Sequence, residues 1–180
     1  MAIPILSMLR QKVTEDVTFK DEEFEALGIA LKGEINAIFG KSIAIREVDT
    51  GSDNSPEIEL VNLTAPHYDI ERFGITFVAS PRHADVLIVT GPVTLNMATA
   101  LRKTYEATPS PKWVIALGDD ACGIGIFRDS YAVVGSVEKV IPVDLKIFGN
   151  PPSPKEIMRG ILGFMKKIRE KNHVGKQSAQ

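Results

Sequence analysis

The sequence predicts a three-layer α/β domain built around a mostly parallel β-sheet. Two observations carry this prediction. Short runs of β-branched residues alternate along the chain with longer segments of helical periodicity, and these short runs are apolar, as buried strands are. Strands separated by helices favour parallel pairing, because each crossover helix covers one face of the sheet.

The predicted elements follow from apolar periodicity and from residues that begin or end helices. One helix has acidic residues in its first turn, after Asp21, and ends at Gly40; another begins at the capping residue Thr94. Ser153-Pro154-Lys155-Glu156 is a third helix start, with serine at the cap and proline at the first position. In chain order we predict a helix over 21–40, a strand over 43–48, a short helix over 57–63, strands over 74–78 and 86–89, a helix over 94–105, strands over 113–117 and 140–143, and a helix over 154–168.

These elements divide the chain into an N-terminal helical extension (1–42), the α/β domain (43–168) and a polar C-terminal tail (169–180) that we expect to be frayed. The basic residues around the tail suit an acidic partner or a membrane surface, and equally a solvated helix face. In parallel sheets, functional residues usually lie in the loops at the carboxyl ends of the strands. The loops expected there are 49–56, 91–96, 118–125 and 148–153.

Composition excludes several classes of protein. With 180 residues, 44% of them apolar and 24% charged, the chain is suited to one globular domain. Its net charge of −2 argues against a nucleic-acid partner. Residues 1–10 do not have the charge order of a secretory signal, and the longest uncharged stretch, 86–101, is broken by glycine, proline and asparagine. We therefore expect a soluble intracellular protein.

Cysteine usage is the most restrictive feature, because Cys122 is the only cysteine. One cysteine excludes an intrachain disulfide, a zinc site with several thiolates and a cluster held by four thiolates of this chain. Cys122 itself is either a small buried apolar group or a reactive thiol in a polar loop. No histidine lies near it in the sequence to act as a base, which favours the packing role.

Two glycine-containing stretches suggest ligand binding, and each has a simpler explanation. Gly40-Lys41-Ser42 matches the last three residues of a phosphate-binding loop, but position 35 is isoleucine where that motif needs its first glycine. The favoured interpretation is therefore that Gly40 ends a helix. In the loop 118–125, two adjacent acids oppose a phosphate. Together with the acids of 49–57 they could bind magnesium, although solvated loop acids are the favoured interpretation.

Six strings spread over most of the chain are more specific than these motifs. They are Pro66–Gly74, Ser80-Pro81-Arg82-His83-Ala84-Asp85, Val89-Thr90-Gly91-Pro92-Val93-Thr94, Pro111–Ile115, Ile141–Asp144 and Pro151–Pro154. In register, they resemble the 20 kDa, electron-transferring subunit family of NADH:quinone oxidoreductase (complex I). Membrane-bound nickel-iron hydrogenases and formate hydrogenlyases share this family, and the second and third strings look most like that branch. The resemblance covers about residues 43–168.

This resemblance implies a flavodoxin-like fold holding one [4Fe–4S] cluster, the last relay before the quinone or nickel-iron site of a large subunit. It also implies the partners: a large, catalytic-type subunit homologue, a ferredoxin-like subunit and membrane subunits. The chain would then be a cytoplasmic protein, peripheral on the cytoplasmic face of the membrane, and not catalytic alone.

The positions that hold the cluster cysteines in the family carry other residues here. They correspond to Asp53, Pro56, Asp120 and Asn150, and Cys122 lies two residues beyond the third of them. Proline has no donor atom in its side chain, and carboxylates and an amide are poor ligands for iron that prefers thiolate. We therefore expect no cofactor and no resident metal in this chain.

Two further residues match family positions near the cluster. Glu57 resembles an acid beside the second ligand, which the family ties to proton movement or to contact with the large subunit, and Arg82 resembles a basic residue close to the cluster. Without a cluster, we expect both to shape an interface and no residue to be catalytic.

Three functional hypotheses follow. The favoured one is a structural or regulatory subunit whose electron relay has been lost. The second is an electron-transfer subunit of an active oxidoreductase complex, with a cluster that is shared with a partner or ligated by Asp53, Asp120 and Cys122. The third is a cation or small-molecule binder that uses the former cluster pocket.

Overall fold

The structure is a computed structural model that describes residues 21–177, with side chains described through residue 171. The stretch 1–10, from which the absence of a secretory signal was predicted, lies outside the described residues. The helices and strands are α2 (Glu22–Phe39), β1 (Ile43–Asp49), α3 (Ser55–Thr64), η1 (Ile70–Phe73), β2 (Ile75–Phe77), η2 (Pro81–His83), β3 (Val86–Thr90), β4 (Val93–Thr94), α4 (Leu95–Ala107), β5 (Trp113–Leu117), α5 (Asp119–Cys122), β6 (Val133–Gly135), η3 (Val137–Lys139), β7 (Leu145–Ile147) and α6 (Pro154–Gln177).

Five strands form one parallel sheet in the order β2-β1-β3-β5-β7. This is the strand order of flavodoxin-like sheets, so the predicted fold class is confirmed. In such sheets the order reverses between the first strand and its inner neighbour, here between β1 and β3. A short antiparallel pair, β4 with β6, lies outside the main sheet.

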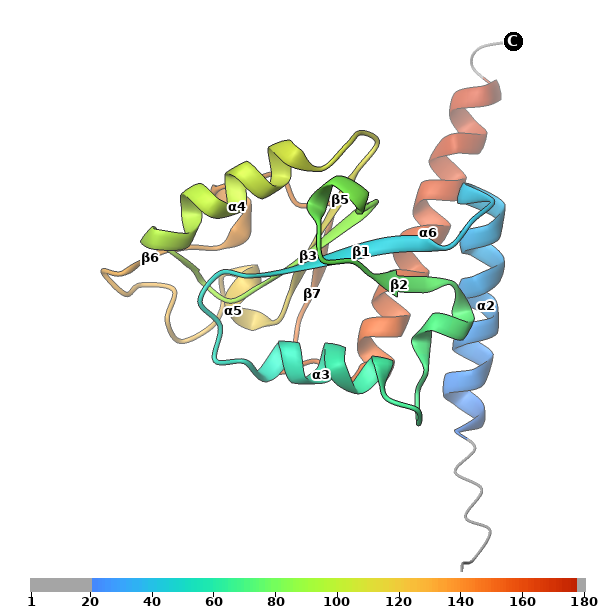
Figure 1. Cartoon of the computed structure of the whole chain (residues 1–180), viewed down its shortest axis with the longest axis horizontal. Coiled ribbons are helices and arrows are strands. Elements are labelled where there is room, and N and C mark those ends of the chain that lie inside the picture. The colour runs from blue at the N-terminus through green and yellow to red at the C-terminus, as the bar shows by residue number, and fades with distance from the viewer. Residues whose placement is uncertain (1–20, 178–180) are drawn as a thin grey trace, which may run out of the picture.

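Helices cover both faces of the sheet (Figure 1). Alternate residues of β3 belong to different cores: Val86 and Ile88 pack with α2, α3 and α6, whereas Leu87 and Val89 pack with α4 and α5. Strand residues point alternately to the two faces, which explains why β3 is apolar and buried at every position.

Helix α2 is part of the larger core, in which Phe24, Leu31 and Ile35 are buried. It begins at Asp21, whose carboxylate accepts the Phe24 N–H, and ends at Gly40 with φ 65°, as predicted. It lies beside α6 (Figure 1), and ion pairs join the two helices, including Arg169 to Glu34. The domain limits at 42 and 169 stay predictions. The expectation that the tail is frayed is wrong as far as Gln177, because helix α6 continues to that residue.

The strand predicted over 140–143 is wrong. Residues Leu145–Ile147 pair with β5 instead, and Val140–Val143 form a turn and loop whose apolar side chains pack in the smaller core. Pro142 cannot donate a ladder hydrogen bond, so apolarity at these positions reflects burial without strand pairing.

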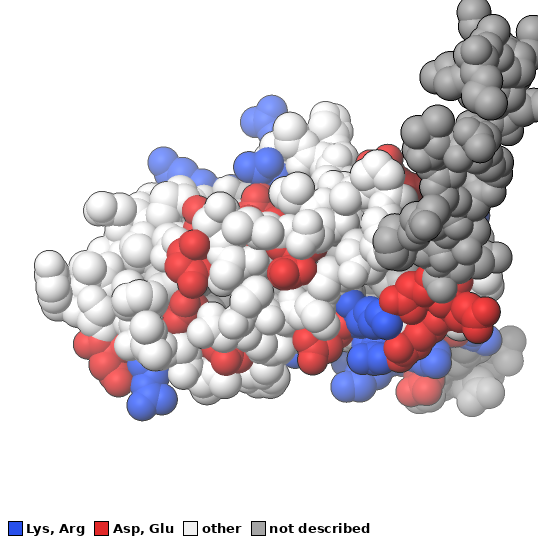
Figure 2. Space-filling view, turned by 90° about the horizontal axis from the view of Figure 1, so that it is seen from below, with Lys and Arg blue, Asp and Glu red and all other residues white. Residues whose placement is uncertain are grey.

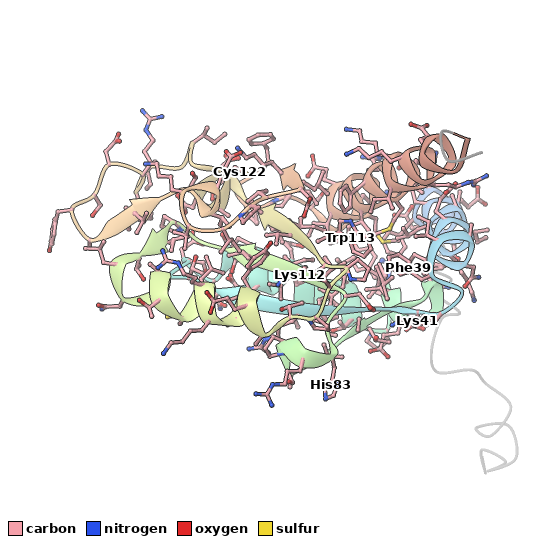
Figure 3. All side chains as sticks on the ribbon, turned by 90° about the horizontal axis from the view of Figure 1, so that it is seen from above. Phe39, Lys41, His83, Lys112, Trp113 and Cys122 are labelled. Atoms are coloured by element: carbon pink, nitrogen blue, oxygen red, sulfur yellow. The ribbon has the colours of Figure 1, made fainter. Side chains whose placement is uncertain are left out.

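Two aspartates tie neighbouring strands together at the amino end of the sheet. Asp85 accepts the Ala44 N–H at 2.9 Å and pairs with Lys41, and Asp144 accepts the Val114 N–H at 2.8 Å. Near this end Phe39 and Trp113 meet edge to face, with ring centroids 5.3 Å apart (Figure 3). Part of the family-like sequence therefore has a structural role.

Candidate functional site

The predicted loops after β1, β3, β5 and β7 meet at the carboxyl end of the sheet. A Cβ at Gly91 would lie 2.4 Å from the backbone nitrogen of Ser52, so the first two loops touch through their backbones. A Cβ at Gly118 would lie 3.2 Å from Pro56 Cγ and 3.6 Å from the carbonyl of Gly149. This convergence agrees with the expectation that function collects where parallel strands end.

Hydrogen bonds hold these loops in place. Asp49 Oδ1 accepts the N–H groups of Gly51 and Ser52, both at 2.8 Å. On the other side, the Asp119 N–H donates to the Gly149 carbonyl at 2.9 Å, and the Gly149 N–H donates to Asp119 Oδ1 at 2.8 Å. The hydrogen bonds of Asp49, Asp119 and Gly149 therefore hold the backbone of these loops in place without the side chains at the predicted ligand positions.

The positions that the resemblance predicts as equivalent to cluster ligands lie on these loops. Asp53 is exposed, and its carboxylate accepts hydrogen bonds from the Ser55 hydroxyl and N–H, which lower its pKa. Pro56 is buried at the start of α3, and Asn150 is exposed on the loop after β7. Neither exposed side chain has the thiolate that iron–sulfur clusters prefer.

The carboxyl group of Asp120 lies against the backbone of the loop that follows α5, at Gly125. Burial, followed by the charges of Asp53 and Asp119, raises the pKa of its carboxyl group. Its Oδ1 is buried and has no hydrogen-bond partner among the described residues, and a Cβ at Gly125 would lie 1.7 Å from it. The third predicted ligand position thus carries a partly buried carboxyl group whose ionised form is disfavoured by its surroundings.

Cys122 is a packing residue, as predicted. It is buried in the smaller core, and its Sγ lies 3.6 Å from the Ala116 carbonyl and 3.7 Å from the Ile147 carbonyl. Burial is the main cause that raises the pKa of its thiol to about 11. A buried thiol with a raised pKa forms little thiolate at neutral pH, which disfavours it as a nucleophile and as a metal ligand.

This burial predicts a specific pH dependence. The thiol pKa rises from an ordinary 9.0 to about 11 on folding, so the stability linked to it is complete below pH 9 and is lost as pH rises toward 11. We expect wild type to lose roughly 2 kcal/mol more than Cys122→Ala over that interval. Urea denaturation of both proteins at several pH values measures this difference, and parallel curves would contradict it.

Arg82 does not join the other predicted site residues. Phe77, at the end of β2, and Val86, at the start of β3, are both in register with Ile45, so the segment between them turns at the amino half of the sheet. Arg82 is exposed on that segment, and its neighbour His83 lies far from Cys122 (Figure 3). The placement of Arg82 near the cluster position is therefore wrong in the free chain.

Glu57 lies beside the loop after β1, and it also lines a cleft that was not predicted from the sequence. Its Oε1 accepts the Ser52 hydroxyl at 2.7 Å, while Oε2 is buried without a hydrogen-bond partner in the described part of the chain. The cleft has a volume of about 380 Å³ between α3, β1 and the residues after β2. Its lining residues are Arg46, Glu47, Glu57, Leu60, Val61, Thr64, Phe77, Val78 and Ala79.

Glu47 is the unexpected member of this cleft. Burial raises its pKa first, and the nearby charge of Glu57 raises it further. A signal for it was present in the sequence, because Ile43, Ile45 and Glu47 occupy alternate positions of β1 and hence the same face of the sheet. A carboxylate in phase with buried residues marks a functional candidate.

Within residues 21–171, no group of three or more acidic, histidine or cysteine side chains could hold a metal ion. In the same part of the chain, no helix combines the length and the apolarity needed to cross a membrane.

Comparison with known proteins identifies the family. The family described as NADH ubiquinone oxidoreductase, 20 Kd subunit, matches residues 54–164. The chain belongs to this family. An uncharacterized protein of Methanocaldococcus jannaschii is 52% identical over 134 residues, which cover 73% of this chain and 90% of that protein.

Two solved structures are similar to this chain. A chain of the membrane-bound sulfane sulfur reductase, an archaeal respiratory membrane complex, is 36% identical with a TM-score of 0.65, covering 76% of this chain and 75% of that one. A chain of an NAD⁺-reducing [NiFe]-hydrogenase shares the fold, with a TM-score of 0.52 at 15% identity, over 64% of this chain and 86% of that one.

The residues of this 20 kDa-type subunit do not fit the family's iron–sulfur cluster. The predicted ligand positions carry two carboxylates, a proline and an amide, and the only cysteine of the chain is buried in a core, where its thiol has a raised pKa. A cluster held by four thiolates therefore has no ligand set in this subunit.

Proposed function

We propose that this chain is a structural or regulatory small subunit of a membrane-associated complex related to hydrogenases and complex I, whose electron relay has been lost. The observation that carries the proposal is the contrast within the site. The loops after β1, β5 and β7 keep their mutual hydrogen bonds and close glycine contacts, while Asp53, Pro56, Asp120 and Asn150 provide no thiolate.

Exposed apolar side chains near the site support a docking role. They come from the loops after α5 and β7 and include Ile126, which is 85% exposed, and Tyr131, which is 96% exposed, as well as Phe127 and Phe148. Large apolar side chains left exposed in this number are typical of surfaces that bind other proteins. We assign this surface to a large, catalytic-type subunit homologue, with ferredoxin-like and membrane subunits completing the complex on the cytoplasmic face.

The similarity to the membrane-bound sulfane sulfur reductase chain supports membership in a respiratory membrane complex. The alternative, a cluster ligated by Asp53, Asp120 and Cys122, has less support. Cys122 belongs to the smaller core, and Asp120 Oδ1 is covered by the loop at Gly125.

Anaerobic purification of the tagged chain from its own cells tests the proposal. We expect other subunits to co-purify, as identified by mass spectrometry. The chain, separated from them and incubated with ferrous iron and sulfide, should retain far less iron than one cluster requires and give no cluster signal by electron paramagnetic resonance on reduction. Stoichiometric iron and sulfide with such a signal, or a chain that carries no partner, would overturn the proposal.

A further inference from the structure

The cleft beside α3 combines apolar walls with opposed charges. Leu60, Val61 and Thr64 of α3 form one side, and Phe77 and Val78 lie on another. Val61 is 66% exposed and lines the same cleft as the carboxylates of Glu47 and Glu57. A cleft that offers both an exposed aliphatic side chain and carboxylates is suited to a long side chain with an apolar stem and a charged end.

The charges in the cleft are unbalanced. Glu47 and Glu57 contribute two negative charges and Arg46 one positive charge, which leaves a net charge of −1. The Glu57 charge raises the pKa of Glu47, and Glu57 Oε2 has no hydrogen-bond donor in the described residues. One additional cation would neutralise the group and provide the missing donor.

The surroundings also suit a basic partner. Figure 2 looks onto the face that carries α3 and shows mostly neutral atoms interrupted by acidic ones, with basic atoms beside α2 and α6 and in smaller groups at the edges of the view. On α3 itself, Ile58 is exposed beside the acidic residues Glu57 and Glu59. A partner surface that complements this face is therefore apolar and carries positive charge.

We propose that this cleft receives one basic side chain, an arginine, from the partner subunit of the proposed function, the large, catalytic-type subunit homologue. The inference rests on the proposed function and names the chemistry of the contact. A guanidinium donates several hydrogen bonds in one plane, so it can reach both Glu47 and Glu57, while its methylene stem packs on Val61 and Phe77. Arginine is also among the residues most enriched in interface hot spots.

The test compares the double variant Glu47→Gln/Glu57→Gln with wild type in the complex. The tagged chain is purified from cells, and retention of the partner subunit is measured as sodium chloride is raised. Removing both carboxylate charges that the arginine would pair with in the complex weakens binding strongly, so we expect at least a tenfold loss of affinity. Glu59→Gln is the control, because Glu59 is on the same helix and bonds Asn62 outside the cleft.

Stability of the free chain separates docking from folding. The two carboxylates repel each other in the free chain, so the double variant should unfold at the same or a higher urea concentration than wild type. If the double variant retains the partner within twofold of wild type, the inference is overturned and the proposed function still stands. A cleft that binds only a free small amine, and no arginine of the partner, would give this same retention. A wild-type chain that captures no partner would overturn both.

Discussion

Cysteines placed together at Asp53, Pro56, Asp120 and Asn150 are expected to restore a cluster site. The backbone of these loops is already cross-linked by the Asp119 and Gly149 hydrogen bonds and by the contact of Gly118 with Pro56. After anaerobic incubation with ferrous iron and sulfide, the quadruple variant should bind about four iron atoms per chain, the content of one [4Fe–4S] cluster. Iron analysis and electron paramagnetic resonance on reduction measure the gain.

The matched control adds Cys122→Ala to the quadruple variant. Because Cys122 is buried in the smaller core, its removal should leave the iron content unchanged. A quadruple variant that folds but binds no iron would contradict the conclusion that the ligand frame is retained. Loss of iron on removal of Cys122 would contradict its assignment to packing.

Gly91→Ala is expected to destabilise the chain by about 3 kcal/mol, since left-handed backbone and overpacking both oppose a side chain there. Gly91 has φ 78°, and a Cβ would lie 2.4 Å from the Ser52 nitrogen and 2.8 Å from the Gly51 carbonyl carbon. Neither contact can be relieved by rotating a flexible side chain. Urea denaturation of the variant measures the loss.

Gly33→Ala is the control for this substitution. Gly33 lies within α2, is exposed, and has no atom within 4 Å of an added Cβ. Alanine there should stabilise the chain by up to about 1 kcal/mol, because it favours helix more than glycine does. Equal effects of the two substitutions would show that the contact between the first two loops is unimportant.

Most of the fold could be predicted because its signals are local. Helix boundaries at Asp21, Gly40 and Ser153 depend on residues within one turn, and the capping contacts between Ser153 and Glu156 are present in the structure. The strand at Leu145–Ile147 was missed because pairing depends on a distant partner. Asp144, whose carboxylate accepts the Val114 N–H, sets where pairing begins, and apolarity alone does not reveal this.

The site was predicted in part for the same reason. Family positions identified Asp53, Pro56, Asp120 and Glu57, which follow strand ends and so come together wherever the strands are parallel. Arg82 was misplaced because the register of β2, only three residues long, decides at which end of the sheet the next segment turns. The cleft at Glu47 requires α3 and β1 to be placed in space.

The reciprocal hydrogen bonds between Asp119 and Gly149 have a consequence for the rate and cost of assembly. Loops joined in this way do not need to be ordered when a partner arrives, so binding forfeits little conformational entropy. A subunit with such a surface docks nearly as a rigid body. Variants that bind a partner more weakly are therefore expected to differ from wild type mainly in the rate of dissociation.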